Sequence, residues 1–80
     1  MRPQWDDLKV FLAVARAETL SRAGQSLRMD PATVGRRVAR LEAAYGAALF
    51  AKSQNGYALT DAGQRLMAPA IRAEQAMEEA

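Results

Sequence analysis

Four side chains between positions 33 and 40 have the chemistry to read a nucleic acid: Thr33, Arg36, Arg37 and Arg40. In an α-helix they would fall within an arc of about 100°, since each residue advances about 100° around the axis. An arginine fork donates to O6 and N7 of guanine together, and a threonine methyl can contact thymine. We therefore predict base readout by Thr33, Arg36 and Arg37. Arg40 is predicted to contact the DNA backbone, with pairing to Glu42 or exposure to solvent as the alternatives.

A row of arginines can also be an ordinary solvated helix face, so the surrounding charge matters. Between positions 20 and 52, six basic residues stand against two acidic ones, Asp30 and Glu42. From position 60 onward, two basic residues stand against four acidic ones. The net charge of +2 therefore combines a basic middle with an acidic end. This distribution favours a polyanion-binding surface on one part of the fold.

Apolar residues recur at helical spacing in the first half of the chain and predict three helices. The first covers 5–18, and the second covers 19–27 with Thr19 or Ser21 as its cap. After a short turn, the third covers 31–45, with Asp30 expected to cap the first turn through its side chain and Gly46 to end the helix. The residues expected to face the core are Leu8, Phe11, Leu12, Val14, Ala15, Leu20, Leu27, Val34, Val38, Leu41 and Tyr45.

A β-hairpin is predicted at 49–59. Two short runs, 49–52 and 57–59, flank Gln54, Asn55 and Gly56. Asn-Gly between apolar residues is a strong hairpin signal, because both residues tolerate positive φ. Such a hairpin would form a wing whose polar tip approaches the DNA backbone or the minor groove. The tip residues are Lys52, Ser53, Gln54 and Asn55, and an ordinary exposed turn is the alternative for them.

The last helix is predicted to begin after Thr60 and to run over 61–80, with a bend or a weakened hydrogen bond at Pro69. Small and apolar residues form a stripe along it, which we predict to be a dimerisation surface. These residues are Ala62, Leu66, Ala70, Ala73 and Met77.

The predicted order of elements defines a mostly α-helical fold with a small β-hairpin. It describes a winged helix-turn-helix over 1–60 followed by a long linker, or dimerisation, helix over 61–80. In such a fold the helix at 31–45 enters the DNA major groove while its neighbour crosses the backbone. Further backbone contacts are expected where the second and third helices begin, at Ser21, Arg22, Asp30, Pro31 and Ala32.

Composition argues against other classes of function. The chain has neither cysteine nor histidine, which removes disulfides, thiolate metal sites and the commonest general base. No metal site, resident cofactor or enzymatic activity is expected. No apolar run has the length of a membrane span and no signal peptide is evident, so we expect no membrane association and a cytoplasmic location. A pure dimerisation or adaptor module is the rival interpretation, but it leaves the arginine cluster unexplained.

Three stretches of the chain resemble LysR-type bacterial transcription regulators. They are WDDLKVFLAVARAETLSRAGQSL, PATVGRRVARLEAAYGAALF and LTDAGQRL. The resemblance covers the chain from Trp5 to about Met77. It implies a homodimer, paired through the linker helix, that binds double-stranded DNA at an interrupted palindrome. It also implies that Arg36 is the recognition-helix arginine, that Thr33 and Arg37 occupy variable base-reading positions, and that Lys52 replaces a wing arginine.

Several positions depart from the family pattern. Pro31 stands in place of a common glutamine, Gly35 in place of a common serine, and Asn55 in place of a frequent wing arginine. These changes leave DNA binding as the prediction and the target sequence open. The resemblance further implies a C-terminal domain that binds a small-molecule effector. That domain is expected to be absent from this chain, which resembles an excised domain rather than a regulator without a sensor.

Overall fold

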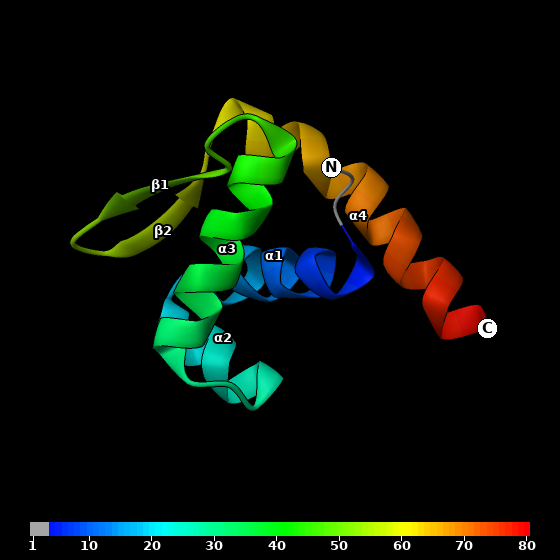
Figure 1. Ribbon diagram of the computed structural model, residues 1–80, viewed down its shortest axis with the longest axis horizontal. Coiled ribbons are helices and arrows are strands. Elements are labelled where there is room, and N and C mark those ends of the chain that lie inside the picture. Colours follow the sequence, from blue (N-terminus) through cyan, green and yellow to red (C-terminus); the bar gives the residue numbers. More distant parts are fainter. Residues whose placement is uncertain (1–3) are drawn as a thin grey trace.

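The computed structural model describes residues 4–80, so the first three residues of the predicted 1–60 domain lie outside it. Along the chain, α1 (Trp5–Ala17), α2 (Leu20–Leu27) and α3 (Pro31–Tyr45) precede a hairpin of β1 (Phe50–Ser53) and β2 (Gly56–Leu59), and α4 (Asp61–Glu79) follows. The hairpin and α4 extend from opposite sides of the three-helix body (Figure 1). This order confirms the predicted fold of a mostly helical chain with one small hairpin. No helix within residues 4–80 combines the length and the apolar character of a membrane span.

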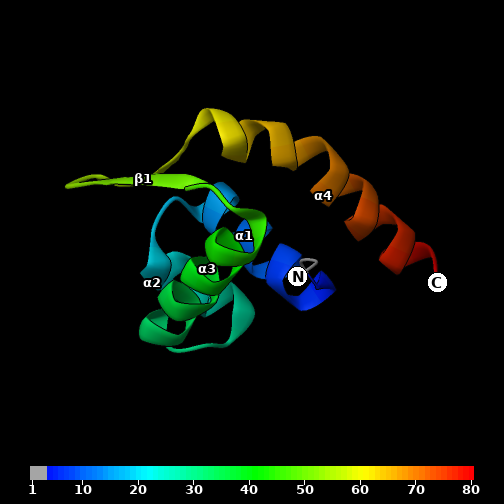
Figure 2. The same cartoon turned by 45° about the horizontal axis from the view of Figure 1, so that its top comes forward.

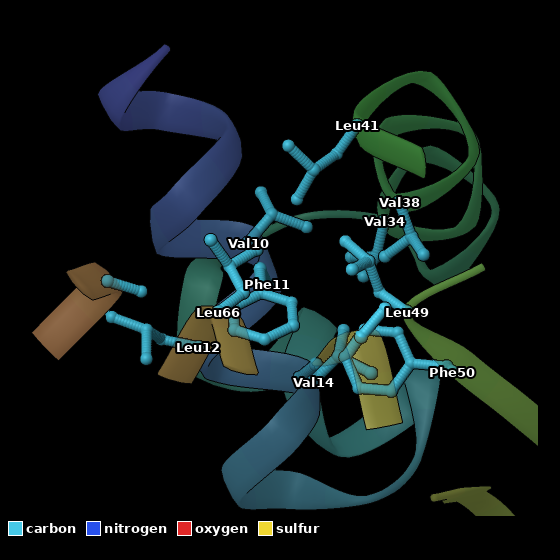
Figure 3. Close-up of a cluster of buried hydrophobic side chains, with 13 residues drawn as sticks. Val10, Phe11, Leu12, Val14, Val34, Val38, Leu41, Leu49, Phe50 and Leu66 are labelled. Carbon is cyan, nitrogen blue, oxygen red and sulfur yellow. The ribbon is translucent and has the colours of Figure 1, made fainter. Parts of the chain in front are cut away.

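Helix α1 lies at the centre of the fold and packs against α2, α3 and α4. Phe11 and Val14 are fully buried and meet side chains from α3 and from the start of β1 (Figure 3). The rings of Phe11 and Phe50 lie 5.4 Å apart, which ties the base of the hairpin to α1. Two predicted core positions differ: Tyr45 is 38% exposed at the end of α3, and Val10, which the helical stripe did not include, is buried.

The turn between α2 and α3 is held by backbone contacts. Thr19 caps α2 by accepting a hydrogen bond from the Arg22 amide at 3.1 Å, which settles the choice between the two predicted caps. At the other end, the Met29 amide donates to the Gly24 carbonyl at 2.8 Å. A Cβ at Gly24 would lie 2.5 Å from the Met29 carbonyl oxygen, so this tight turn requires glycine there. The prediction for Asp30 is wrong in one respect: it is the N-cap residue of α3, but its side chain makes no capping hydrogen bond.

The hairpin pairs Phe50 with Leu59 and Ser53 with Gly56 in antiparallel register. The predicted Asn-Gly turn is wrong in detail, since the two residues between the strands are Gln54 and Asn55 and only Gly56 has positive φ, at 128°. The hairpin also contacts the helical body, because the Tyr57 amide donates to the Glu18 carbonyl at 2.7 Å. This bond anchors β2 to the end of α1.

Helix α4 is capped by Thr60, which accepts a hydrogen bond from the Gly63 amide at 3.1 Å and donates to the Ala48 carbonyl at 2.6 Å. Its axis curves along its length (Figure 2), as expected from Pro69, which has no N–H to donate. Three members of the predicted dimerisation stripe, Ala62, Leu66 and Ala70, are buried in the core of the chain itself. Because α4 packs against α1 and β2, the spacing that would suit a partner helix here serves packing within the chain.

Candidate nucleic-acid interface

The outer face of α3 carries the predicted base-reading residues. Arg36 is exposed, and its Nη2 donates to Thr33 Oγ1 at 3.0 Å, so these two side chains form one polar unit on the first two turns. Together with Arg37 and Arg40 they line an open depression of about 250 Å³. The structure thus brings together all four residues that the spacing predicted. An arginine oriented by a neighbouring hydroxyl is well prepared for bidentate recognition of a base edge.

The two remaining arginines lie closer to the body. Arg37 is half-buried and also lines a second hollow, beside Lys9 of α1 and Met29 of the turn. Arg40 donates through Nη2 to Oδ1 of Asp7, a carboxylate on α1 whose side chain is only 7% exposed. The Arg40 side chain is still 56% exposed, which leaves guanidinium N–H groups on the surface. Asp7 lies in the first turn of α1, and nothing in the local sequence pattern indicated that it would be buried against α3.

Pairing of Arg40 with Glu42, one of the predicted alternatives, does not occur, because Glu42 has other partners. Its Oε2 accepts hydrogen bonds from the Leu49 amide at 2.8 Å and the Phe50 amide at 3.2 Å. These bonds hold the start of β1 against the end of α3. Glu42 is therefore a positioning residue that sequence reasoning missed. Glu42 lies within the stretch PATVGRRVARLEAAYGAALF that carries the family resemblance, which is the signal that could have drawn attention to it.

A groove joins α3 to the hairpin. It has a volume of about 440 Å³, and its lining includes Arg36 from α3 and Lys52 from β1. The Lys52 ammonium lies 5.9 Å from the centre of the Tyr57 ring, and Tyr57 also lines the groove. Its lining otherwise consists mainly of small and apolar side chains from α2, α3 and β1. The predicted recognition helix and the predicted wing thus present their basic side chains to one concave surface.

The tip of the hairpin is polar and exposed. Ser53 Oγ accepts a hydrogen bond from the Asn55 amide at 3.2 Å and donates to the Gly56 carbonyl at 3.3 Å, so this predicted contact residue stabilises the turn itself. The side chains of Gln54 and Asn55 are exposed beside it and form no hydrogen bond within residues 4–80. They are accessible to a partner that approaches the groove.

The other predicted backbone contacts lie at helix starts. Pro31 and Ala32 are exposed at the first turn of α3, where backbone N–H groups have no partner within the helix. No side chain caps these groups, which leaves them accessible to an anion. Ser21 and Arg22 are exposed on α2. No hydrogen bond or ion pair of their side chains is found within the described residues, so the structure leaves them accessible without assigning them a role.

The described part of the chain contains no group of acidic side chains that could hold a metal ion. Its distinctive surface is a basic helix, a tight preceding turn and a basic hairpin around a shared groove. A helix of this kind presented beside a hairpin defines a winged helix-turn-helix, a class of fold in which the second helix of the motif faces DNA.

Comparison with known proteins assigns the family. The model of the family described as bacterial regulatory helix-turn-helix protein, lysR family, matches residues 5–64. The Mau operon transcriptional activator of Paracoccus denitrificans is 36% identical over 74 residues, which is 92% of this chain and 26% of that protein. The HTH-type transcriptional regulator YofA of Bacillus velezensis is 39% identical over a stretch of the same length. The chain belongs to the LysR family of bacterial regulatory helix-turn-helix proteins.

Solved structures agree with this assignment. The CbnR DBD–DNA complex contains a chain that matches with a TM-score of 0.90 and 30% identity, over 96% of this chain and 88% of that one. The fold is therefore that of the winged helix-turn-helix domains of LysR regulators, as predicted. The relatives are transcription regulators, which confirms the expectation that the chain is not an enzyme. This chain spans about a quarter of the length of the curated relatives.

Proposed function

We propose that this chain binds double-stranded DNA sequence-specifically, with α3 in the major groove and the hairpin on the backbone or in the minor groove. The observation that carries the proposal is the groove that Arg36 and Lys52 share, since it presents the helix and the wing to one ligand. Similarity to the CbnR DBD–DNA complex supports the same role. The basic residues around the groove match a phosphate-rich partner in charge.

The predicted site residues divide into those that read bases and those that contact the DNA backbone. Arg36, Thr33 and Arg37 read base edges, and Arg36 is the principal reader because it is the most exposed of the three. Lys52, Ser53, Gln54 and Asn55 contact the backbone from the wing. Arg40 contributes a phosphate contact through the N–H groups that Asp7 does not use. Further backbone contacts fall at the starts of α2 and α3, namely at Ser21, Arg22, Asp30, Pro31 and Ala32.

We also propose that α4 pairs two chains into a homodimer that binds an interrupted palindrome. Of the predicted stripe, only the part that the core leaves accessible can meet a partner: Ala73 is half-buried and Met77 is 51% exposed. Two-fold symmetry would place two copies of α3 about one DNA turn apart, or a multiple of that distance. In this arrangement 1–60 reads DNA in the bacterial cytoplasm and 61–80 links the subunits. Effector binding would belong to a domain outside this chain.

The test is selection from a pool of randomised duplex DNA at moderate salt. Enrichment of an interrupted palindrome is the expected result, and it would establish base readout and a two-fold dimer together. Enrichment of a single unpaired half-site would support base readout but contradict the dimer. Retention of DNA without any enrichment would refute sequence-specific reading. Absence of retention at low salt would make an adaptor module the better interpretation.

A further inference from the structure

A two-armed ion pair joins α4 to α1. Arg16 donates through Nη1 to Oε2 of Glu74 and through Nη2 to Oε1, both at 2.8 Å. Fork-to-fork geometry restrains direction as well as distance, unlike a single contact between long side chains. Hydrogen bonding to Arg16 lowers the pKa of Glu74 below its ordinary value. The pair is therefore charged at neutral pH.

The pair lies where the partly buried part of α4 ends. At its start α4 is fixed, because Gly63 lies so close to the Leu49 carbonyl oxygen that a Cβ there would approach it to 2.2 Å. Burial of Leu66 and Ala70 continues this packing, but Pro69 has no N–H to donate to the carbonyl of Arg65, so one helical hydrogen bond is missing there. Beyond Glu74, residues 75–80 are all exposed. The end of α4 thus follows a weakened turn, with the ion pair as its restraint.

Helix α1 connects this restraint to the DNA-reading helix. Asp7 and Arg16 are nine residues apart, so they lie on opposite sides of α1, about 180° apart around its axis. On one side Asp7 binds Arg40 of α3, and on the other Arg16 binds Glu74 of α4. The two ion pairs thus join α3 and the end of α4 to opposite sides of α1.

We propose that Arg16 and Glu74 are positioning residues that set the spacing between the DNA half-sites a dimer accepts. This inference rests on the proposed function, because α4 must pair the two subunits. About eleven residues follow Pro69, or roughly 16 Å of helix at about 1.5 Å per residue. A swing of about 20° at the proline would move the helix end by roughly 5–6 Å, which exceeds the rise of one base pair, about 3.4 Å.

The first experiment measures the direction of α4. The chain has no cysteine, so Gln25→Cys and Ala76→Cys, both at exposed positions, introduce two unique sites for spin labels. Labelled chains are diluted with unlabelled chains so that only distances within one subunit are recorded. We expect a narrow distance distribution in the otherwise unchanged chain and a broader one in Glu74→Gln. The control Glu79→Gln, an exposed acid on the same helix, should leave the distribution narrow.

The second experiment measures which spacing between two DNA half-sites the dimer accepts. Paired half-sites with spacers that vary by single base pairs are offered to the unchanged chain, to Arg16→Gln, to Glu74→Gln and to the exchange Arg16→Glu with Glu74→Arg. In the single variants we expect the retained amount of DNA whose spacer is one base pair longer or shorter than the preferred one to rise about two- to fivefold. This is the effect expected of losing an exposed ion pair. The exchange should restore the original profile, which mere destabilisation of the fold would not do.

The outcomes separate this inference from the proposed function. Failure of the unchanged chain to bind any paired half-site would refute the proposed dimer and, with it, the spacing role. Paired binding with the same spacer profile in all variants would overturn the inference and leave the proposed function standing. Equal distance distributions in the unchanged chain and Glu74→Gln would overturn it as well, because α4 would then need no restraint from Arg16.

Discussion

Arg40 on the exposed side of α3 donates to Asp7, a buried carboxylate of α1. A carboxylate removed from water is stable only with a charged or hydrogen-bonding partner, and here the partner comes from the helix that we propose to read DNA. One arginine thus fixes the position of α3 and still presents N–H groups to the surface. The position of α3 in the fold and the positive charge on its surface therefore both depend on Arg40.

The pair predicts an unequal effect of two arginine substitutions on α3. Arg40→Ala should lower the free energy of unfolding by about 1–3 kcal/mol, because it leaves Asp7 buried without its partner. Arg36→Ala should change stability by less than about 0.5 kcal/mol, since Arg36 is exposed and its side chain hydrogen-bonds, within residues 4–80, to Thr33 of its own helix alone. Urea denaturation measures both. In a double-mutant cycle, the cost of Arg40→Ala should shrink when Asp7→Ala is also present, and independent costs would contradict the assignment.

Glu42 provides a second prediction, on the attachment of the wing. Glu42→Ala removes the acceptor for two amides and should lower the free energy of unfolding by about 2–3 kcal/mol. Glu42→Gln keeps a neutral acceptor of the same shape, and its cost should be about half as large. Amide hydrogen exchange at Leu49 and Phe50 should accelerate in both variants. Unchanged exchange at these two amides in Glu42→Ala would show that they are protected without the carboxylate.

Two glycines with positive φ form a matched pair for the third prediction. At Gly46, with φ 87°, an added Cβ meets no atom within 4 Å, so Gly46→Ala should cost about 1–2 kcal/mol from backbone strain alone. At Gly56, with φ 128°, an added Cβ would lie 2.3 Å from the Glu18 carbonyl oxygen. Gly56→Ala should therefore cost more than Gly46→Ala and should also move the hairpin. Thermal unfolding compares the two, and equal losses would mean that the hairpin adjusts freely at this contact.

The sequence predicted the order of elements well, because the signals involved are local. Helical spacing of apolar residues identified α1 and α3, and Pro31 and Gly46 marked the two ends of α3. The arginine cluster was also predictable, since residues three and four apart share a helix face whatever the rest of the fold does. Local signals failed to show which hydrogen-bond partner a polar side chain adopts. Asp30 had the residue type of a capping side chain, yet its carboxylate caps nothing.

Contacts between distant segments could not be predicted. Asp7 is 33 residues from Arg40, and Arg16 is 58 residues from Glu74, so no pattern within one helix indicates either pair. The same limit explains the stripe on α4, because spacing shows that Leu66 and Ala70 share a face but not whether α1 or a second chain covers it. The role of Glu42 shows the same limit, because its partners are the Leu49 and Phe50 amides, which lie outside its own helix.

Acid should release the ion pair between Arg16 of α1 and Glu74 of α4, which is the fourth prediction. The pKa of Glu74 lies below its ordinary value because Arg16 donates hydrogen bonds to it. A lowered pKa in the folded state stabilises the fold above the ordinary value of 4.5, and this contribution is lost as pH falls through the lowered pKa. The Tm difference between the unchanged chain and Glu74→Gln should thus stay constant from pH 8 to about pH 5 and vanish in stronger acid.

Other charges near the pair determine how this titration is read. Lys9 and Arg28 line one surface hollow with Arg16 and Glu74, apart from the groove between α3 and the hairpin. The hydrogen bond to Glu74 is the main cause that raises the pKa of Arg16, and the charge of Glu78 adds to it. Glu78→Gln is therefore the control: its Tm difference should be the smaller, because Glu78 forms no ion pair within residues 4–80. A Tm difference for Glu74→Gln that persisted below pH 2 would assign its effect to packing rather than charge.

The last prediction separates base reading from backbone contact in the shared groove. Arg36→Ala should weaken binding to the selected DNA by about 1–3 kcal/mol and relax selectivity at one base position, because bidentate donation to a base edge is lost. Lys52→Ala should weaken binding to all sequences alike and reduce the slope of log K against log salt by about 0.9, the value for one released counterion. Titration of matched and mismatched duplexes at several salt concentrations measures both effects. Uniform weakening by Arg36→Ala would make it a phosphate contact, and an altered base preference in Lys52→Ala would place the wing on base edges.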